Sequence, residues 1–272
     1  EMCIRDRYKD INLSTINYSR PKPLFLDGKD DGYVMIRFLF LNAFIALLSI
    51  ILCFWALILF LFTRDGSLLH RYAAVPWARA ILFVCGVHLD VRGTGNIERE
   101  KPRVYISNHQ SYFDILALLA GLPADFKFLL KQELMKIPLL GFTLGKVGYI
   151  SIDRSDIRKA VNAVNEAVEK IRGGASVLLF PEGTRSEDGR LGKFKKGGFH
   201  LALKAGCDIV PVAIVRSREI VPKGSLRINR GTIFMNIGKP IPVKEYSKRE
   251  IDGLMNRSRE SVAHLMAQST GR

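Results

Sequence analysis

Cysteine is scarce in this sequence, and its few cysteines follow no metal-binding or disulfide pattern. The chain has 272 residues and only four cysteines, which are Cys3, Cys53, Cys85 and Cys207. This scatter contains no Cys-x-x-Cys pair and favours a reducing compartment. Four of the five histidines, His70, His88, His200 and His264, also lack the close spacing of zinc ligands. We therefore expect no metal and no bound cofactor.

Acidic residues are also few relative to basic ones. The chain carries 41 Lys and Arg against 26 Asp and Glu, a formal net charge of +15. Such a balance favours a polyanionic partner, which could be nucleic acid, an anionic lipid surface or a phosphorylated substrate. Zinc-finger spacing, an RNA-binding signature and a basic recognition helix are all missing from the sequence. We therefore expect no nucleic-acid partner.

One long stretch has no charge at all. Residues 38–62 are uncharged and largely apolar. A helix of that length reaches about 37 Å, which exceeds the roughly 30 Å of a bilayer core. The stretch therefore predicts a transmembrane or deeply inserted helix rather than a shorter core helix or a cleaved signal peptide. Arg37, Arg64 and Arg71 flank it on both sides and leave its orientation undecided.

A second apolar segment, residues 72–88, predicts another helix with Pro76 in its first turn. It fits an interfacial membrane helix and an ordinary core-facing helix equally well. These features divide the chain into a tail over residues 1–32, a membrane anchor over 33–90 and a globular domain over 91–272. Residues 1–9 look unlike the rest of the chain, so we leave them out of the fold prediction.

Short apolar runs alternate with helical patterns after the anchor. This alternation predicts an α/β domain with a largely parallel sheet flanked by helices. The expected strands are Val104–Ser107, Phe126–Leu130, Tyr149–Ile152, Val177–Phe180, Ile209–Val215 and Thr232–Ile237.

Two helices have clear boundaries in the sequence. The first is predicted to begin after Ser155 as N-cap, to bury an apolar face that includes Val161, and to end at Gly173. The second begins with a capping box formed by Ser247 and Glu250. We expect both apolar faces to pack in the core.

The first chemical motif is Asn-His-Gln-Ser-Tyr-Phe-Asp at residues 108–114. If Asp114 accepts the Nδ1 proton of His109, Nε2 is left bare and can take a proton from an alcohol. The spacing Ser111-x-x-Asp114 also fits a helix capping box, in which Asp114 would only satisfy backbone groups. Ser111 could in principle act as a nucleophile, but we expect it to cap the following helix.

The second motif is Phe-Pro-Glu-Gly-Thr-Arg-Ser at residues 180–186. Gly183 permits close backbone approach, and Arg185 offers a planar fork suited to phosphate oxygens. A surface pair between Glu182 and Arg185 is the plainer alternative. Arg154 follows a predicted strand, where it could help to hold a phosphate or lie on the surface. The basic run over residues 193–198 could contact phosphates or simply be solvated.

These motifs, together with the blocks at 148–154 and 209–214, resemble the membrane-bound glycerolipid acyltransferases, and most closely the bacterial 1-acyl-sn-glycerol-3-phosphate acyltransferases. The resemblance covers roughly residues 104–237 and implies that the domain over 91–272 is the acyltransferase domain. It implies that the chain moves a fatty acyl group to the sn-2 hydroxyl of 1-acyl-sn-glycerol 3-phosphate and forms phosphatidic acid. It also implies that His109 and Asp114 are catalytic and that Glu182, Gly183, Thr184 and Arg185, with Arg154, bind the glycerol phosphate.

The resemblance implies three partners, which are lysophosphatidic acid, an acyl thioester and a membrane. The acyl donor would be acyl-CoA or acyl carrier protein, used as a co-substrate. Because such donors are soluble, we expect the catalytic domain to face the cytoplasm from the cytoplasmic membrane. Other lysophospholipids or glycerol 3-phosphate are alternative acceptors, and a catalytically silent lipid binder is the alternative from another functional class.

Overall fold

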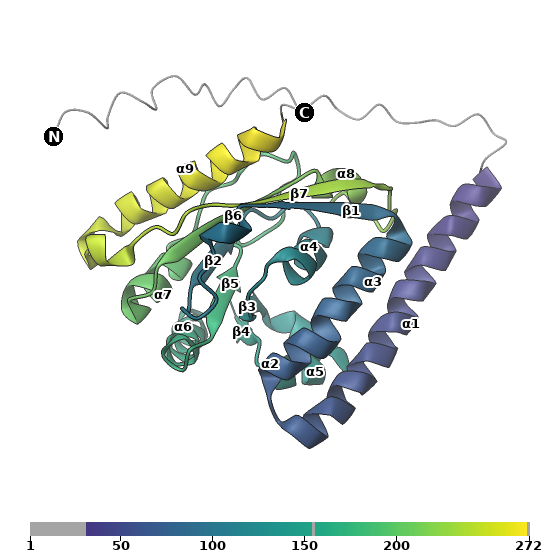
Figure 1. Ribbon diagram of the computed structural model, residues 1–272, viewed down its shortest axis with the longest axis horizontal. Coiled ribbons are helices and arrows are strands. Elements are labelled where there is room, and N and C mark those ends of the chain that lie inside the picture. The colour runs from purple at the N-terminus through teal and green to yellow at the C-terminus, as the bar shows by residue number, and fades with distance from the viewer. Residues whose placement is uncertain (1–30, 154–155, 271–272) are drawn as a thin grey trace. The chain divides into compact units, whose positions relative to one another are not determined.

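The structure is a computed structural model that describes residues 31–153 and 156–270. Residues 37–272 form one compact unit, to which the following description refers. Its centre is a seven-stranded sheet with the strand order β1-β7-β6-β2-β5-β3-β4 (Figure 1). The strands are β1 (Val87–Arg92), β2 (Val104–Ser107), β3 (Phe126–Lys131), β4 (Ile150–Ile152), β5 (Ser176–Leu179), β6 (Ile209–Val215) and β7 (Gly231–Ile237).

The strands from β6 to β4 run parallel to one another, whereas β7 is antiparallel to β6 and pairs in parallel with β1. This arrangement confirms the predicted α/β domain with a largely parallel sheet. The six predicted strands are all present, with bounds that agree to within one residue.

Helices cover both faces of the sheet. The side chains of Tyr105, Leu178 and Val210 belong to the core on the face covered by α3 (Val75–Cys85) and α4 (Phe113–Gly121). Their neighbours Val104 and Val177 belong to the core on the opposite face. That face carries α6 (Ile157–Arg172), α7 (Gly197–Ala205) and α9 (Ile251–Thr270), as Figure 1 shows. Strand side chains alternate between the two faces of the sheet. Because helices cover both faces, both sets of side chains are buried.

The predicted helix over residues 72–88 is wrong at its end. A π-helical turn (His70–Ala74) leads into α3, which stops at Cys85 because Gly86 adopts a left-handed conformation with φ of 69°. The chain then enters β1, which contains His88. β1 extends across the domain boundary predicted after residue 90, so the sheet begins before that boundary.

Two further details of the predicted helices are corrected. The N-cap of α6 is Asp156, not Ser155, because the Asp156 carboxylate accepts hydrogen bonds from the backbone N–H groups of Arg158 and Lys159. Val161 is 52% exposed, since the buried face of α6 contains Ala163 and Ala167 instead. The capping box of Ser247 and Glu250 is confirmed.

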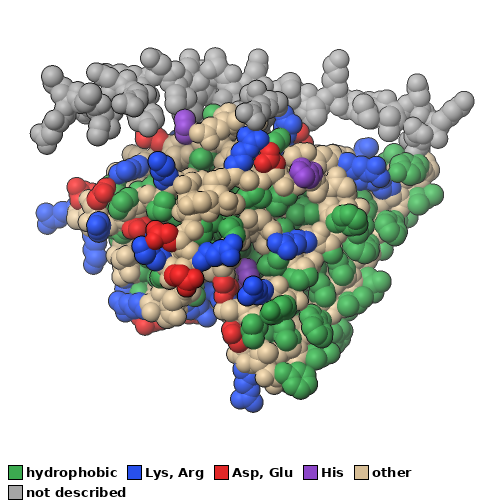
Figure 2. Space-filling view, viewed as in Figure 1, with side chains coloured by type: hydrophobic (Ala, Val, Ile, Leu, Met, Phe, Trp, Pro, Cys, Tyr) green, Lys and Arg blue, Asp and Glu red, His purple; other side chains and the backbone are tan. Residues whose placement is uncertain are grey.

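The long uncharged stretch lies in α1 (Asp31–Thr63), followed by the short α2 (Gly66–Leu69). Residues 32–63 are long and apolar enough to cross a membrane, with a mean hydropathy of 3.0 and only 11% of the most apolar segment buried. Figure 2 shows hydrophobic side chains gathered along the surface that α1 forms. Exposed examples in this helix are Leu39, Phe40, Leu47, Phe54, Leu61 and Phe62.

Hydrogen bonds join α1 to other segments of the compact unit at several points along its length. The indole N–H of Trp77 in α3 donates to Ser49 Oγ at 3.0 Å, and the indole N–H of Trp55 donates to the carbonyl of Tyr72 at 3.2 Å. Near its start, Arg37 Nη1 donates to the carbonyl of Ile228 at 2.7 Å. Within residues 37–63, the helix therefore lies along the globular part rather than projecting from it.

Candidate active site

The two chemical motifs meet because β2 and β5 are parallel neighbours. Ile106 in β2 pairs with Leu179 in β5, so both strands end at the same edge of the sheet. Residues 108–114 follow β2, and residues 180–186 follow β5. The backbone N–H of Ser186 donates to the carbonyl of His109 at 2.8 Å and joins the two loops directly. Ligand sites of open α/β sheets commonly lie at this carboxyl edge.

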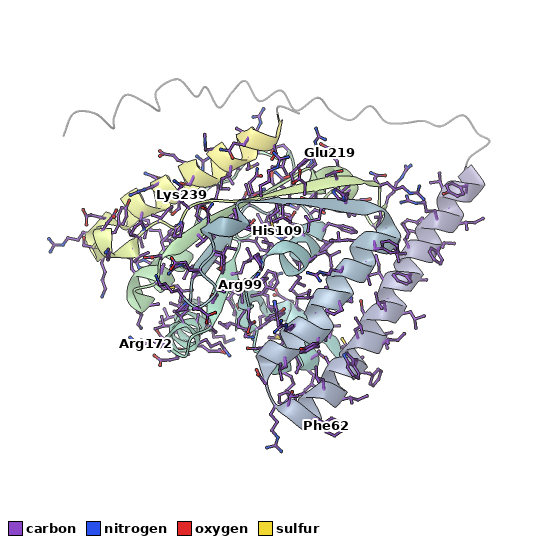
Figure 3. All side chains as sticks on the ribbon, viewed as in Figure 1. Phe62, Arg99, His109, Arg172, Glu219 and Lys239 are labelled. Carbon is purple, nitrogen blue, oxygen red and sulfur yellow. The ribbon has the colours of Figure 1, made fainter. Side chains whose placement is uncertain are left out.

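His109 and Asp114 form a hydrogen-bonded pair, as the spacing predicted. Nδ1 of His109 lies 2.8 Å from Oδ2 of Asp114. The Asp114 side chain is fully buried, and the His109 side chain is 16% exposed. Figure 3 marks His109 next to α4, the helix that carries Asp114 in its first turn. The pairing holds the imidazole with Nε2 free of Asp114, the arrangement that a general base requires.

Asp114 also satisfies backbone groups, although not those alone, as the capping alternative had it. Its Oδ2 accepts hydrogen bonds from the backbone N–H groups of Gln110 at 2.6 Å and Ser111 at 2.8 Å. One oxygen thus orders the loop and the imidazole together. The other oxygen, Oδ1, is buried and has no hydrogen-bond partner among the described residues.

Ser111 occupies a structural position. Its hydroxyl donates to the carbonyl of Val221 at 2.8 Å and accepts from the backbone N–H of Phe113 at 3.2 Å. The residue is completely buried. The N-cap residue of α4 is Tyr112 rather than Ser111, although the Ser111 hydroxyl does accept from the first N–H group of the helix. These contacts leave the hydroxyl poorly placed to act as a nucleophile.

Two residues that hold the histidine loop were not identified from the sequence. The ring of Phe180 stacks on the His109 imidazole with centroids 3.9 Å apart and planes 13° apart. The Asn108 amide bonds both backbone groups of Ile214 in β6, donating to its carbonyl and accepting from its N–H at 2.7 Å each. Both contacts depend on strand neighbours that are distant in the sequence, so no local pattern could have revealed them.

Glu182 contacts backbone rather than solvent. Its Oε1 accepts from the N–H of His109 and its Oε2 from the N–H of Gly192, both at 2.8 Å. Burial raises the pKa of this carboxyl above its usual value, and the two N–H groups oppose that shift. Glu182 therefore joins the His109 loop to the segment around Gly192 and is occupied by these two bonds.

The remaining residues of the second motif surround this carboxylate. Gly183 has a φ of 77°, a left-handed conformation that favours glycine. Thr184 is exposed, and Arg185 is half-buried. The guanidinium carbon of Arg185 lies 3.7 Å from the ring centroid of Tyr112, inside the first motif. Arg154 lies outside the described residues, so nothing in the structure tests its predicted contact with phosphate.

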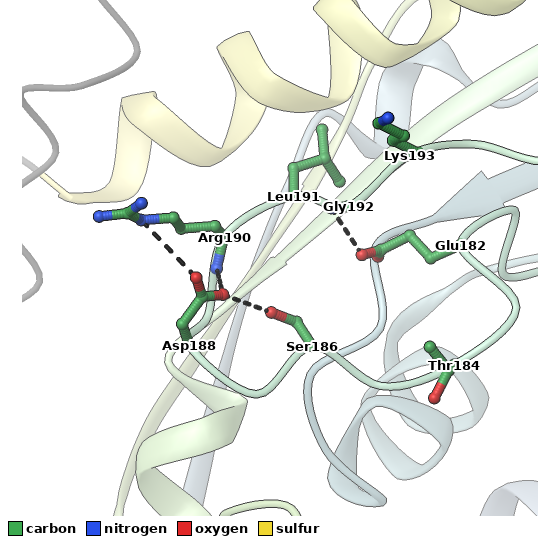
Figure 4. A pocket seen from close by; sticks show the side chains of 8 residues that line it. All are labelled: Glu182, Thr184, Ser186, Asp188, Arg190, Leu191, Gly192 and Lys193. Carbon is green, nitrogen blue, oxygen red and sulfur yellow. Dashed lines mark hydrogen bonds and ion pairs between the residues drawn. The ribbon is translucent and has the colours of Figure 1, made fainter.

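A cavity of about 350 Å³, lined mainly by polar and charged residues, adjoins these loops. Figure 4 shows its lining, in which the Glu182 carboxylate points to Gly192 and Asp188 contacts Ser186 and Arg190. Lys193, from the basic run of the sequence, also lines it.

The strand around Pro211 packs in the core. All seven residues of β6 are buried, and Val210 and Val212 belong to the hydrophobic core beneath α3 and α4. Within residues 31–153 and 156–270, no group of three or more His, Cys, Asp or Glu residues could hold a metal ion.

Comparison with known proteins gives consistent similarities. The acyltransferase family model matches residues 88–215. A 1-acyl-sn-glycerol-3-phosphate acyltransferase of Pseudomonas aeruginosa is 34% identical over 204 residues, which cover 73% of this chain and 78% of that protein. A chloroplastic 1-acyl-sn-glycerol-3-phosphate acyltransferase of Arabidopsis thaliana is 38% identical over 199 residues, which cover 72% of this chain and 54% of the relative. The chain spans little more than half the length of such plant relatives.

The crystal structure of the 1-acyl-sn-glycerophosphate acyltransferase of Thermotoga maritima has the same fold. It matches with a TM-score of 0.75 at 27% identity and covers 88% of this chain and 98% of that chain. These similarities confirm the family resemblance that the motifs indicated. The segment matched by the family model contains both motifs. The chain belongs to the acyltransferase family that includes the 1-acyl-sn-glycerol-3-phosphate acyltransferases.

Proposed function

We propose that the protein transfers a fatty acyl group from a thioester to the sn-2 hydroxyl of 1-acyl-sn-glycerol 3-phosphate and so forms phosphatidic acid. The observation that carries the proposal is the 2.8 Å hydrogen bond between His109 and the fully buried Asp114 at the carboxyl end of β2. The similarity to relatives named for this activity supports the choice of acceptor.

In the proposed reaction His109 is the general base. Its Nε2 takes the hydroxyl proton while the hydroxyl oxygen bonds to the thioester carbonyl carbon. The tetrahedral adduct then collapses, the carbon–sulfur bond breaks, and the departing sulfur receives the proton from the imidazolium. The products are the ester and a free thiol, so no oxidant or metal is consumed. Asp114 stabilises the imidazolium that forms in between.

Arg185 is the proposed ligand of the acceptor phosphate. Its Nη1 is buried and has no hydrogen-bond partner among the described residues, which leaves a charged donor available for phosphate oxygens. We propose that Arg154 assists it and that Gly183 and Thr184 shape the adjoining backbone. Glu182 supports the site through the backbone of His109 rather than through the acceptor.

The donor is proposed to be acyl-CoA or acyl carrier protein. Another lysophospholipid or glycerol 3-phosphate is an alternative acceptor that the same base could serve. A catalytically silent lipid binder is disfavoured, because a buried carboxylate oriented on a histidine contributes to proton transfer and not to lipid affinity.

We further propose that α1 inserts into the cytoplasmic membrane from the cytoplasmic side without crossing it. Arg37 near one end of the helix bonds Ile228, and Phe60 near the other end lies 4.8 Å from Nζ of Lys146 in α5 (Leu140–Val147). A helix fastened at both ends to one globular unit is poorly placed to stand across a bilayer. Its exposed apolar side fits the acyl region of one leaflet.

The first experiment measures turnover. Membranes that contain the protein are incubated with 1-acyl-sn-glycerol 3-phosphate and radiolabelled acyl-CoA or acyl carrier protein, and labelled phosphatidic acid is counted. We expect product from the native protein and from the surface control His264→Ala, and none above background from His109→Ala. Product that persists in His109→Ala would remove this residue from the mechanism, and no product with either donor would overturn the proposed activity.

The second experiment tests the anchor. In a Cys3→Ser background, a cysteine introduced at Ser19, ahead of α1, is labelled with a membrane-impermeant maleimide in sealed vesicles of known orientation. A second variant carries its cysteine at the exposed Asn162 of α6. Insertion predicts that both positions react from the cytoplasmic side. Reaction from opposite sides would show that α1 crosses the bilayer.

A further inference from the structure

We propose that Tyr112 is a positioning residue that holds the Arg185 guanidinium for the acceptor phosphate, an inference that rests on the proposed function. The guanidinium carbon lies 3.7 Å from the centroid of the Tyr112 ring. This distance corresponds to stacking contact. The other cation–ring pairs in the described part of the chain lie at 4.8 Å or more.

Burial does not account for the presence of an aromatic side chain at this position. Tyr112 is 53% exposed, whereas its neighbours Ser111 and Phe113 are buried. It also gives no side-chain hydrogen bond to the start of α4, where it stands as the N-cap residue. The contact through which its ring acts is therefore the one with Arg185.

Stacking restrains an arginine without occupying its hydrogen-bond donors. All five N–H groups of a guanidinium point outward in its own plane, so a ring on one face leaves them free. A carboxylate in the same place would fix the side chain equally well, but it would compete with phosphate for those donors. The unpartnered, buried Nη1 of Arg185 agrees with a site in which the face is held and the edge is kept available.

Glu187, an acidic residue two positions after Arg185, is paired with Lys223. Nζ of Lys223 donates to Oε1 of Glu187 at 2.9 Å and to the backbone carbonyl of Arg185 at 3.0 Å. Lys223 thus fixes the backbone of the arginine while it pairs with Glu187. Backbone and side chain of Arg185 are each restrained, and neither contact uses the guanidinium donors.

Tyr112 also places the phosphate site and the base on one short segment. It lies three residues after His109 and two before Asp114. The backbone N–H groups of Gln110 and Ser111 both donate to Asp114, and these bonds restrain the segment. An arginine stacked on it keeps a fixed separation from the imidazole. Such a separation would select acceptors whose hydroxyl lies at one distance from the phosphate.

The test compares Tyr112→Leu with Tyr112→Phe. We expect Tyr112→Leu to raise KM for 1-acyl-sn-glycerol 3-phosphate roughly 3- to 30-fold, the range of a cation–π contact, with kcat and the KM of the donor changed less than about twofold. Tyr112→Phe keeps the ring and should restore KM. As a matched control, Tyr246→Leu removes another arginine contact, the 3.0 Å bond from Arg257, and should leave KM unchanged.

A double mutant separates positioning from direct substrate contact. In an Arg185→Gln background, Tyr112→Leu should cause no further rise in KM, because the residue acts through the arginine. The proposal is overturned if Tyr112→Leu leaves KM for the acceptor unchanged, or if Tyr112→Phe raises KM as much as Tyr112→Leu does. It is also overturned if Tyr112→Leu raises KM by its full factor again in the Arg185→Gln background.

A binding measurement keeps this inference distinct from the proposed activity. In a His109→Ala background, detergent-solubilised protein is titrated with 1-acyl-sn-glycerol 3-phosphate and with 1-acyl-sn-glycerol, which lacks the phosphate. Tyr112→Leu should weaken only the first. If the native enzyme forms no phosphatidic acid and this selective loss is still seen, the activity fails and the role of Tyr112 stands. If both ligands weaken equally or neither does, the role of Tyr112 fails.

Discussion

The imidazole of His109 lies flat against the phenyl ring of Phe180, with the ring planes 13° apart. Asp114 fixes the imidazole in its plane through Nδ1, and Phe180 fixes its face. The Phe180 ring is in turn stacked with the ring of Phe128 in β3, with centroids 6.4 Å apart. The imidazole is therefore supported by two successive aromatic rings. The direction of Nε2 is therefore set by two contacts of different kinds.

Replacing Phe180 should slow the reaction more than it weakens binding. We expect Phe180→Leu to lower kcat about 10-fold with little change in KM, since a small displacement of a catalytic group is costly. Phe194→Leu is the matched control, because Phe194 is a buried phenylalanine in the core on the other face of the sheet. Steady-state kinetics normalised to folded protein decides the matter, and equal kcat in the two variants would contradict the prediction.

Asp114→Asn should be inactive although it keeps the volume of the side chain. The amide can still accept from the backbone of Gln110 and Ser111, but it cannot stabilise an imidazolium and it favours the wrong tautomer. We expect kcat to fall at least about 100-fold. Circular dichroism should show a folded protein. A folded variant with native kcat would mean that Asp114 serves only the backbone.

Glu182→Gln should cost both activity and stability at neutral pH. An amide has one acceptor oxygen, so either His109 or Gly192 loses its partner and a donor faces a donor. We expect about 1–3 kcal/mol of lost stability and a lower kcat, with KM for the acceptor nearly unchanged. Glu169→Gln, at an exposed ion pair with Arg172, is the control. A rise in KM alone would show instead that Glu182 binds the acceptor.

His70 should make the protein acid-sensitive. Burial lowers the pKa of His70 to about 4 from its usual 6.5, an effect opposed by Asp125 and reinforced by Lys127. Between these values the unfolded chain binds a proton that the folded chain does not, so stability is full above pH 6.5 and falls as the pH drops toward 4. The slope is at most about 1.4 kcal/mol per pH unit.

The corresponding measurement is thermal unfolding across that pH range. His70→Gln cannot take up the proton and should flatten the pH dependence, whereas the exposed His264→Gln should leave it as it is. An unchanged acid sensitivity in His70→Gln would assign the effect to other groups.

The N-cap of α6 should contribute to stability. We expect Asp156→Ala to lower the free energy of unfolding by about 1 kcal/mol, because two backbone N–H groups lose their acceptor. Asn162→Ala, at an exposed position of the same helix, should be neutral or slightly stabilising. Chemical denaturation of the two variants beside the native protein measures this difference.

Most of the strands and the His109–Asp114 hydrogen bond were predictable because they depend on local patterns. The fully buried strands are short apolar runs, and the His109–Asp114 spacing lies within one loop and one helix turn. β1 was missed because His88, Asp90 and Arg92 interrupt its apolar residues. The helix before it also ends at one isolated glycine, Gly86, which is a weak stop signal in the sequence. The roles of Phe180, Tyr112 and Glu182 depend on which strands become neighbours, and a single sequence does not state that.

The pairing of β1 with β7 has a consequence for biosynthesis. Val87 in the edge strand β1 lies opposite Gly231 in β7, so 144 positions separate these two paired residues. During translation α1 emerges from the ribosome long before β7 exists, and it can reach the lipid while the sheet is still open. If α1 inserts as proposed, this last pair of strands closes a domain that is already held at the membrane. We expect closure over so long a segment to be slow, because the contact is distant in sequence.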